Sequence, residues 1–150
     1  MNSFLTSIAN ELIVIRLDRG EDILESVQNV INERNIQNGA VISGIGTVDQ
    51  CVLHFVTDNR DAKAVLFKEW KDTALEVAGI QGIIANGVPH LHGVISNSEQ
   101  AWAGHIEPGC RTLFLCEILI MAFHGRGFDR VHATSDPKDS DYAIMSLTQL

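Results

Sequence analysis

The stretch PHLHGVISNSEQAWAGHIEPG, from Pro89 to Gly109, decides how the rest of the sequence is interpreted, because it holds three of the six histidines. Residues 88–96 alternate apolar and polar side chains and predict a β-strand, and residues 101–107 predict a second one. The four residues between them, Asn-Ser-Glu-Gln, are typical of a loop. An antiparallel hairpin is therefore expected here.

The loop length fixes which side chains face one another across this hairpin. The facing pairs are Ser96 with Ala101, Val94 with Ala103, His92 with His105, and His90 with Glu107. Opposed side chains lie about 5 Å apart, and alternate residues share a face of the strand. His90, His92 and His105 are thus predicted to point the same way, with Glu107 beside them. Gly93 and Gly104, on the other face, would allow close approach of a neighbouring backbone.

Three imidazoles within a few ångströms of one another match the histidine-rich ligand set of a catalytic zinc site, which leaves the fourth position to water or substrate. The prediction depends on the register, since a shift of one residue would send His105 to the opposite face. The alternative is that His90 and His92 are half-exposed strand residues unrelated to His105, because His-x-His alone is a short pattern.

The composition indicates one globular domain over residues 1–150, with a core at about 10–135 and a C-terminal tail at 136–150. Of the 150 residues, 45% are hydrophobic and 20% charged. The formal net charge of −8 opposes non-specific attraction to nucleic acid, which depends on Lys and Arg. DNA binding would need a partner or a local basic patch such as Arg126 with Arg130.

Cys51, Cys110 and Cys116 are odd in number and have no Cys-x-x-Cys spacing, so neither a disulfide framework nor a thiolate zinc site is indicated. Buried, reduced thiols in a cytoplasmic protein are expected. The N-terminal residues lack a basic region ahead of an apolar run, and no apolar stretch is long enough to span a bilayer. We therefore expect no membrane association.

The segments before the hairpin predict one helix and several strands. A strand at 11–17 is followed by Asp18-Arg19-Gly20-Glu21, which resembles a capping box, and by a helix at 21–34 with one apolar stripe. Residues 40–46, AVISGIG, predict a strand with a bend or bulge, and their glycines fit a phosphate loop poorly. Further strands are expected at 47–57, 64–70 and 73–85, the last joined to the histidine strand by the hairpin signal Asn86-Gly87.

After the hairpin, residues 111–123 are almost continuously apolar and predict a fully buried strand, although a helix is not excluded by periodicity. Glu117 interrupts this run, so it is expected either to pair with an ordinary Arg or Lys or to assist a metal or ligand. A short strand is predicted near 128–133 and an amphipathic end from Tyr142. His124 and His132 are interpreted as surface residues.

The sequence resembles the PPC domain family, the plant and prokaryote conserved domain. The matching segments are RLDRGEDILESV at 16–27, SGIGTV at 43–48, LEVAGIQGII at 75–84, PHLHGVIS at 89–96, AGHIEPG at 103–109 and CEILI at 116–120. The resemblance implies an α/β (α+β) fold in which a curved, mostly antiparallel sheet packs against the helix at 21–34. It also implies a homotrimer.

In prokaryotic members of this family the matching motifs are associated with a bound metal ion, commonly zinc, which the resemblance places on His90, His92 and His105. Ala103 stands where the family often has the first glycine of Gly-Gly-His. The chain has no AT-hook, the Arg-Gly-Arg-Pro-type segment by which plant relatives engage DNA, so their DNA binding does not transfer.

Two functions from different classes remain. The first is a trimeric metal-binding protein whose divalent ion keeps a position open for a small ligand. If that site is catalytic, Glu107 or Glu117 would act as the base. The second is a DNA-associated or protein-interaction module in which the metal site is structural. The sequence alone does not decide whether the protein is an enzyme.

Overall fold

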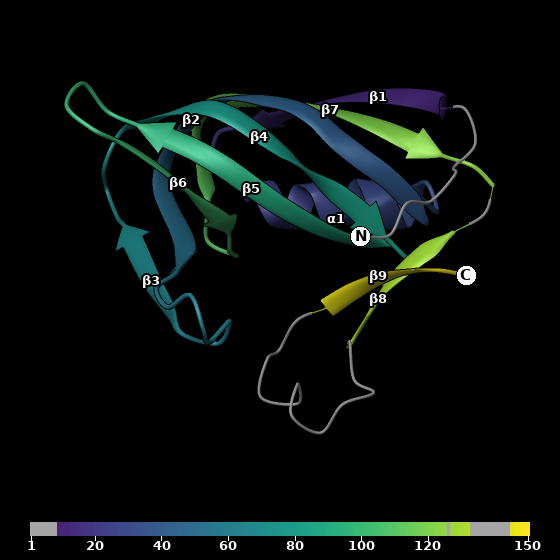
Figure 1. Ribbon diagram of the computed structural model, residues 1–150. Coiled ribbons are helices and arrows are strands. Elements are labelled where there is room, and N and C mark those ends of the chain that lie inside the picture. Colours follow the sequence, from purple (N-terminus) through teal and green to yellow (C-terminus); the bar gives the residue numbers. More distant parts are fainter. Residues whose placement is uncertain (1–8, 126, 133–144) are drawn as a thin grey trace.

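A computed structural model describes residues 9–125, 127–132 and 145–150 of the chain (Figure 1). The elements in chain order are β1 (Ala9–Asp18), α1 (Ile23–Glu33), β2 (Asn38–Val56), β3 (Val65–Trp70), β4 (Leu75–Ala85), β5 (Val88–Ser96), β6 (Ala101–Ile106), β7 (Arg111–Phe123), β8 (Phe128–His132) and β9 (Met145–Gln149). The predicted α+β class, with one helix and a mostly antiparallel sheet, is confirmed.

The main sheet has the strand order β1-β7-β2-β4-β5-β6, and β3 pairs with β2 outside this path. The far end of β2 also pairs with β6, through Leu53 with Ile106 and His54 with His105. Strands β2, β4, β5 and β6 therefore form a closed circuit of pairings, which requires the sheet to curve strongly. Figure 1 shows α1 beneath one face of this sheet.

β2 is a single strand of 19 residues, so the expectation of separate strands at 40–46 and 47–57 is wrong. Its pairing with β7 shifts register between Val41 and Ser43 and again between Gly46 and Gln50. The predicted bulge is thus present, and it bends the strand without ending it. A Cβ atom at Gly46 would lie 2.6 Å from the Cα of Cys116, so the strands approach too closely there for a larger residue.

The helix α1 packs on the sheet through the predicted apolar stripe, and Ile23, Val27 and Ile31 are buried. Its N-cap is Asp22, whose carboxylate accepts a hydrogen bond from the backbone N–H of Glu25. The sequence predicted that the capping box begins at Asp18, but the N-cap lies four residues later in the chain. The carboxylate of Glu21 does accept from the N–H of Asp18, but this contact closes the turn before the helix.

Asn86 and Gly87 form the predicted tight turn between β4 and β5, and both have positive φ angles, of 48° and 74°. This is the backbone that a two-residue hairpin with Asn-Gly favours. The histidine strand β5 consequently lies inside the sheet, between β4 and β6, as expected.

β7 has the predicted bounds, but the expectation that it is fully buried is wrong. From Cys116 onward buried and more exposed side chains alternate, and the two residues before it, Phe114 and Leu115, are 64% and 38% exposed. The apolar side chains on the exposed face of β7 therefore lack cover within the described part of the chain.

The C-terminal part contributes β8 and β9, which pair with each other in a separate two-stranded sheet. β8 confirms the strand predicted near 128–133. β9 lies within the segment 136–150 that was expected to be a tail, whereas residues 133–144 are outside the described residues.

Candidate metal centre

The β5–β6 hairpin has the register that the loop length predicts. His92 pairs with His105, Val94 with Ala103, and Ser96 with Ala101. The pairing ends at His92 and His105, because β6 ends at Ile106. The backbone N–H of Glu107 instead donates to the carbonyl of Val52 in β2, at 3.0 Å, so the predicted facing of His90 and Glu107 is not formed.

The curvature of the sheet adds a histidine that the sequence analysis did not include. On the other side of β6, His54 of β2 pairs with His105, so His105 lies between His92 and His54 in neighbouring strands. The imidazoles of His54 and His105 are stacked, with ring centroids 4.4 Å apart and an interplanar angle of 16°. His54 and His105 are 51 positions apart in sequence, and nothing local to either strand predicts this long-range pairing.

The three histidines that the sequence predicted as ligands lie together. The ring centroid of His105 is 4.8 Å from that of His90 and 5.4 Å from that of His92, and the rings of His90 and His92 are 5.1 Å apart. The Nε2 atoms of His90 and His92 are separated by 3.2 Å. These rings therefore form a triangle with nearly equal sides.

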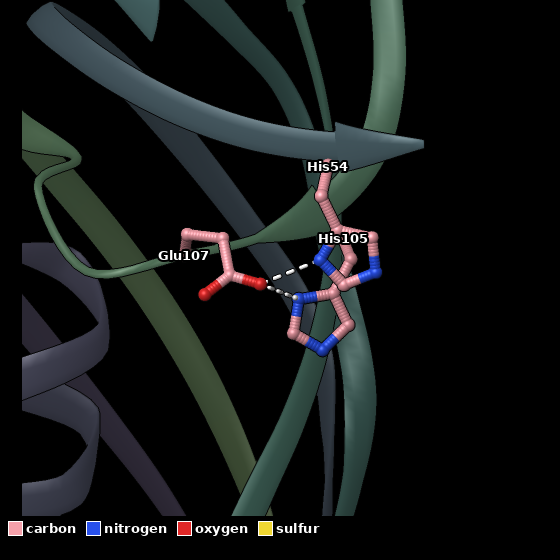
Figure 2. A group of neighbouring side chains, drawn as sticks. All are labelled: His54, His105 and Glu107. Carbon is pink, nitrogen blue, oxygen red and sulfur yellow. Dashed lines mark hydrogen bonds and ion pairs between the residues drawn. The ribbon is translucent and has the colours of Figure 1, made fainter. Parts of the chain in front are cut away.

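Glu107 faces the other side of the cluster, and Figure 2 shows its carboxylate directed at both His54 and His105. Its Oε1 atom is 2.5 Å from Nδ1 of His54 and 3.3 Å from Nδ1 of His105. The Nδ1 atom of His105 is buried and has no hydrogen-bond partner among the described residues. One ligand atom from each of His54, His105 and Glu107 lies within 4.8 Å of the others, which makes this the group of described side chains whose ligand atoms are close enough together to hold a metal ion; those of His90, His92 and His105 do not all lie that close.

The two groups differ in exposure. His90 and His92 are exposed, whereas the side chains of His54, His105 and Glu107 are each about one quarter exposed, at 23%, 26% and 23%. Loss of part of its hydration to the neighbouring imidazoles, reinforced by repulsion from His105, lowers the pKa of His90 to about 4. Partial burial and the neighbouring His54 also lower the pKa of His105. The neutral imidazole, which is the form that binds metals, is therefore favoured at both positions.

Two hollows adjoin the exposed histidines. A cavity of about 420 Å³ lies between β2, β4, β5 and β6 and is lined by His92, Ile42 and Val94 among others. A second, of about 360 Å³, is lined by both His90 and His92 together with Gln81 and Arg130. There is room beside these imidazoles for a small ligand.

The remaining sequence candidates lie elsewhere. Glu117 is exposed on β7, in register with Arg16 of β1 and Ile45 of β2, outside the imidazole cluster. The guanidinium of Arg130 donates to the carbonyls of Ile83 and Val88, and Arg126 lies outside the described residues. His124 is exposed, as predicted.

A family model for the Plants and Prokaryotes Conserved domain matches residues 7–124. The chain belongs to this family. The matched region contains all five residues of the cluster, from His54 to Glu107, so the imidazoles and the carboxylate are part of the family domain and not of an added segment.

Several solved structures have the same fold as this chain. A PPC protein from Pyrococcus horikoshii is 20% identical, with a TM-score of 0.76 and full coverage of both chains. A metal-containing protein from Archaeoglobus fulgidus is 20% identical, with a TM-score of 0.78 over 95% of this chain and 97% of that one. A candidate DNA-binding protein from Bacteroides thetaiotaomicron is 18% identical, with a TM-score of 0.75 over 98% of each chain. At these identities the likeness concerns the fold.

Two curated relatives are larger proteins. The bifunctional protein GlmU of Synechococcus sp. strain JA-2-3B'a(2-13) is 27% identical over 107 residues, which is 71% of this chain and 16% of the relative. GlmU of strain JA-3-3Ab is 26% identical over 107 residues, which is again 71% of this chain and 16% of the relative. This chain therefore corresponds to a small part of those proteins.

In the described part of the PPC chain, no helix has the length and apolar character needed to cross a membrane.

Proposed function

We propose that this PPC domain binds one divalent metal ion, with zinc as the expected ion, through the imidazoles of His90, His92 and His105. The triangle of rings, with centroids 4.8 to 5.4 Å apart, carries the proposal. Zinc binds imidazole nitrogen at about 2.0–2.1 Å in tetrahedral geometry, which sets neighbouring rings about 5 Å apart. The spacing of the rings is therefore that of imidazoles around one ion, and small rotations of the side chains would bring the nitrogen of His105 to the pair formed by His90 and His92.

The nitrogen atoms of the exposed pair also fit. Two tetrahedral ligands of one zinc ion are about 3.3 Å apart, and the Nε2 atoms of His90 and His92 are 3.2 Å apart. Because both side chains are exposed beside the two hollows, a fourth position would be accessible to water or a small ligand. The metal-containing relative from Archaeoglobus fulgidus, which has the same fold, is consistent with this proposal.

The ligand atoms of His54, His105 and Glu107 lie closer together, within 4.8 Å of one another, but the orientation of the two rings opposes a shared ion. The lone pairs of imidazole lie in the ring plane, so two rings stacked at 16° direct them nearly parallel and not toward one point. Glu107 Oε1 already forms a hydrogen bond with Nδ1 of His54, at 2.5 Å. We therefore assign Glu107 and His54 to the support of His105. The Glu107 carboxylate lies 3.3 Å from Nδ1 of His105, a contact without hydrogen-bond geometry, and a carboxylate beside that nitrogen favours one orientation of the ring.

A bound divalent ion would supply Lewis acidity and lower the pKa of a coordinated water molecule. Glu107 contacts Nδ1 of His105 and would act on a ligand in the open position only through that imidazole, whereas Glu117 lies on another part of the sheet. An assay for turnover of esters, amides or related compounds decides whether such a site catalyses a reaction or only binds a small molecule. If the site is catalytic, His92→Ala would abolish the turnover.

The donor set is tested by zinc titration in competition with a chromogenic chelator, on correctly folded variants. We expect His92→Ala and His105→Ala to lose tight binding, and His54→Ala to weaken it by roughly 10- to 100-fold. His124→Ala, an exposed histidine outside the cluster, is the matched control and should bind like the native chain. Loss of binding in His54→Ala with full binding in His92→Ala would instead identify His54, His105 and Glu107 as the ligands.

A homotrimer is the assembly that we propose for this domain. Its support is the sheet face opposite α1, which exposes large apolar side chains on several strands. They include Leu12, Val14, Ile42, Ile45, Ile83 and Val94. Large apolar surfaces that stay contiguous are rarely left uncovered in monomeric proteins. His90 and His92 point from the same face of β5 as Val94, so the metal ion would lie close to the contact between subunits.

DNA binding is the second candidate, favoured by the description of the Bacteroides thetaiotaomicron relative. The net charge of −8 and the use of Arg130 in contacts to carbonyl groups oppose it. Retention on DNA at low salt that falls steeply as salt rises would support it, because phosphate contacts release counterions. Absence of retention at low salt would reject it.

A further inference from the structure

Cys51 and Cys110 lie side by side in the core although 59 positions separate them in the sequence. Cys51 is in β2, and Cys110 is in the turn that joins β6 to β7. Their Sγ atoms are 2.9 Å apart, and both side chains are buried, with exposures of 2% and 1%. Both are free thiols, as expected from the sequence, but their proximity was not predicted.

Contacts on both sides hold this pair in place. The Sγ atom of Cys110 lies 3.4 Å from both the N–H and the carbonyl oxygen of Val52, the residue after Cys51. The turn ahead of Cys110 is fixed as well, because the N–H of Glu107 donates to Val52 and the N–H of Gly109 donates to the carboxylate of Asp22. The two sulfur atoms therefore face each other in a fixed position.

We propose that Cys51 and Cys110 form a reversible intrachain disulfide when the protein meets a peroxide-class oxidant. A disulfide has a sulfur–sulfur bond of about 2.05 Å, so only a small displacement of the two Sγ atoms is needed. The bond would tie β2 to the turn that carries Glu107, independently of whether a metal ion is bound.

The reaction balances with hydrogen peroxide alone. One thiol displaces hydroxide from the peroxide, the O–O bond breaks, and a sulfenic acid and one water molecule result. The second thiol attacks the sulfenic sulfur, the S–S bond forms, and a second water molecule leaves. The two thiols together lose two electrons and two protons. Because both sulfurs are buried, a small oxidant is expected to react in the folded state while bulky alkylating reagents react slowly.

Cys116 is the internal control for this proposal. It is also buried, but it lies in β7 opposite Leu17 and Gly46, away from the contact between Cys51 and Cys110. Oxidation should therefore join Cys51 to Cys110 and leave Cys116 as a free thiol.

The test is treatment of the native chain with hydrogen peroxide, followed by denaturation, alkylation and tryptic mapping without reductant. We expect a linked pair of peptides, 35–60 and 72–111, that a dithiol reductant separates, together with an alkylated Cys116. The oxidised chain should unfold at a higher temperature, by roughly 10 °C, because the bond closes a long loop. Cys116→Ser should give the same linked peptides, and Cys51→Ser should give none.

Three outcomes would overturn the proposal. The first is that the linked peptides are absent although longer treatment with peroxide oxidises no further residue. The second is that Cys51 and Cys110 become sulfinic acids and are not linked. The third is that the disulfides found join different chains. Since the map of the native chain needs neither a variant nor a metal ion, the result is independent of the proposed metal site.

Discussion

At the scale of single residues, His105 is the side chain on which the candidate centre depends. It faces His92 across one strand boundary and His54 across the other, and its buried Nδ1 atom lies 3.3 Å from Glu107. The carboxylate thus contacts His105 on the side away from the proposed ion, and its negative charge should make that imidazole a better ligand.

Glu107→Gln tests this role, because it keeps the shape of the side chain and removes its charge. We expect the affinity for zinc to fall by about 10- to 100-fold with the stoichiometry unchanged, measured by chelator competition. Glu99→Gln, on the exposed loop between β5 and β6, is a control that should not change the affinity. Complete loss of binding would mean that Glu107 is itself a ligand, and an unchanged affinity would mean that it plays no part.

At the scale of elements, the centre depends on how closely β2 approaches β6. A Cβ atom at Gly104 would lie 2.8 Å from the carbonyl oxygen of His54 and 3.1 Å from the ring of Phe55. Only a residue without a side chain permits this contact. The close backbone approach that the sequence predicted at Gly104 is therefore real, and its partner is β2.

We expect Gly104→Ala to destabilise the fold by about 1–3 kcal/mol, since the added methyl group meets backbone that cannot move away freely. Gly79→Ala, in β4, is the matched control, because a Cβ atom there would meet nothing within 4 Å. It should be neutral or stabilise by up to about 1 kcal/mol. The measurement is the free energy of unfolding in urea, and equal effects of the two variants would contradict the account of the β2–β6 contact.

Local patterns explain which parts of the fold could be predicted from the sequence. The Asn86-Gly87 turn and the four-residue loop before Ala101 fix register over short distances, so His92 could be placed opposite His105. His54 could not be placed, since its pairing with His105 follows from the bulges in β2 and the closure of the sheet. The apolar run of β7 led to a wrong expectation of full burial, because a chain considered alone does not reveal what covers its exposed face.

At the scale of the whole molecule, the exposed apolar face opposite α1 should be covered by other copies of the chain. We expect light scattering after size exclusion to give the mass of three chains of 16.5 kDa each. Ile42→Glu, on that face, should dissociate the assembly, whereas Lys63→Glu, on an exposed loop, should not. A native chain that stays monomeric at micromolar concentration would contradict the trimer.

The central claim is that three imidazoles from one hairpin hold a metal ion, and elemental analysis of protein purified without an affinity tag tests it most directly. The account predicts about one divalent ion per chain in the native protein and in His124→Ala. It predicts loss of the ion in both His92→Ala and His105→Ala. A native chain that holds no metal, even after zinc is supplied at neutral pH, would contradict the claim and leave the histidines as ordinary strand residues.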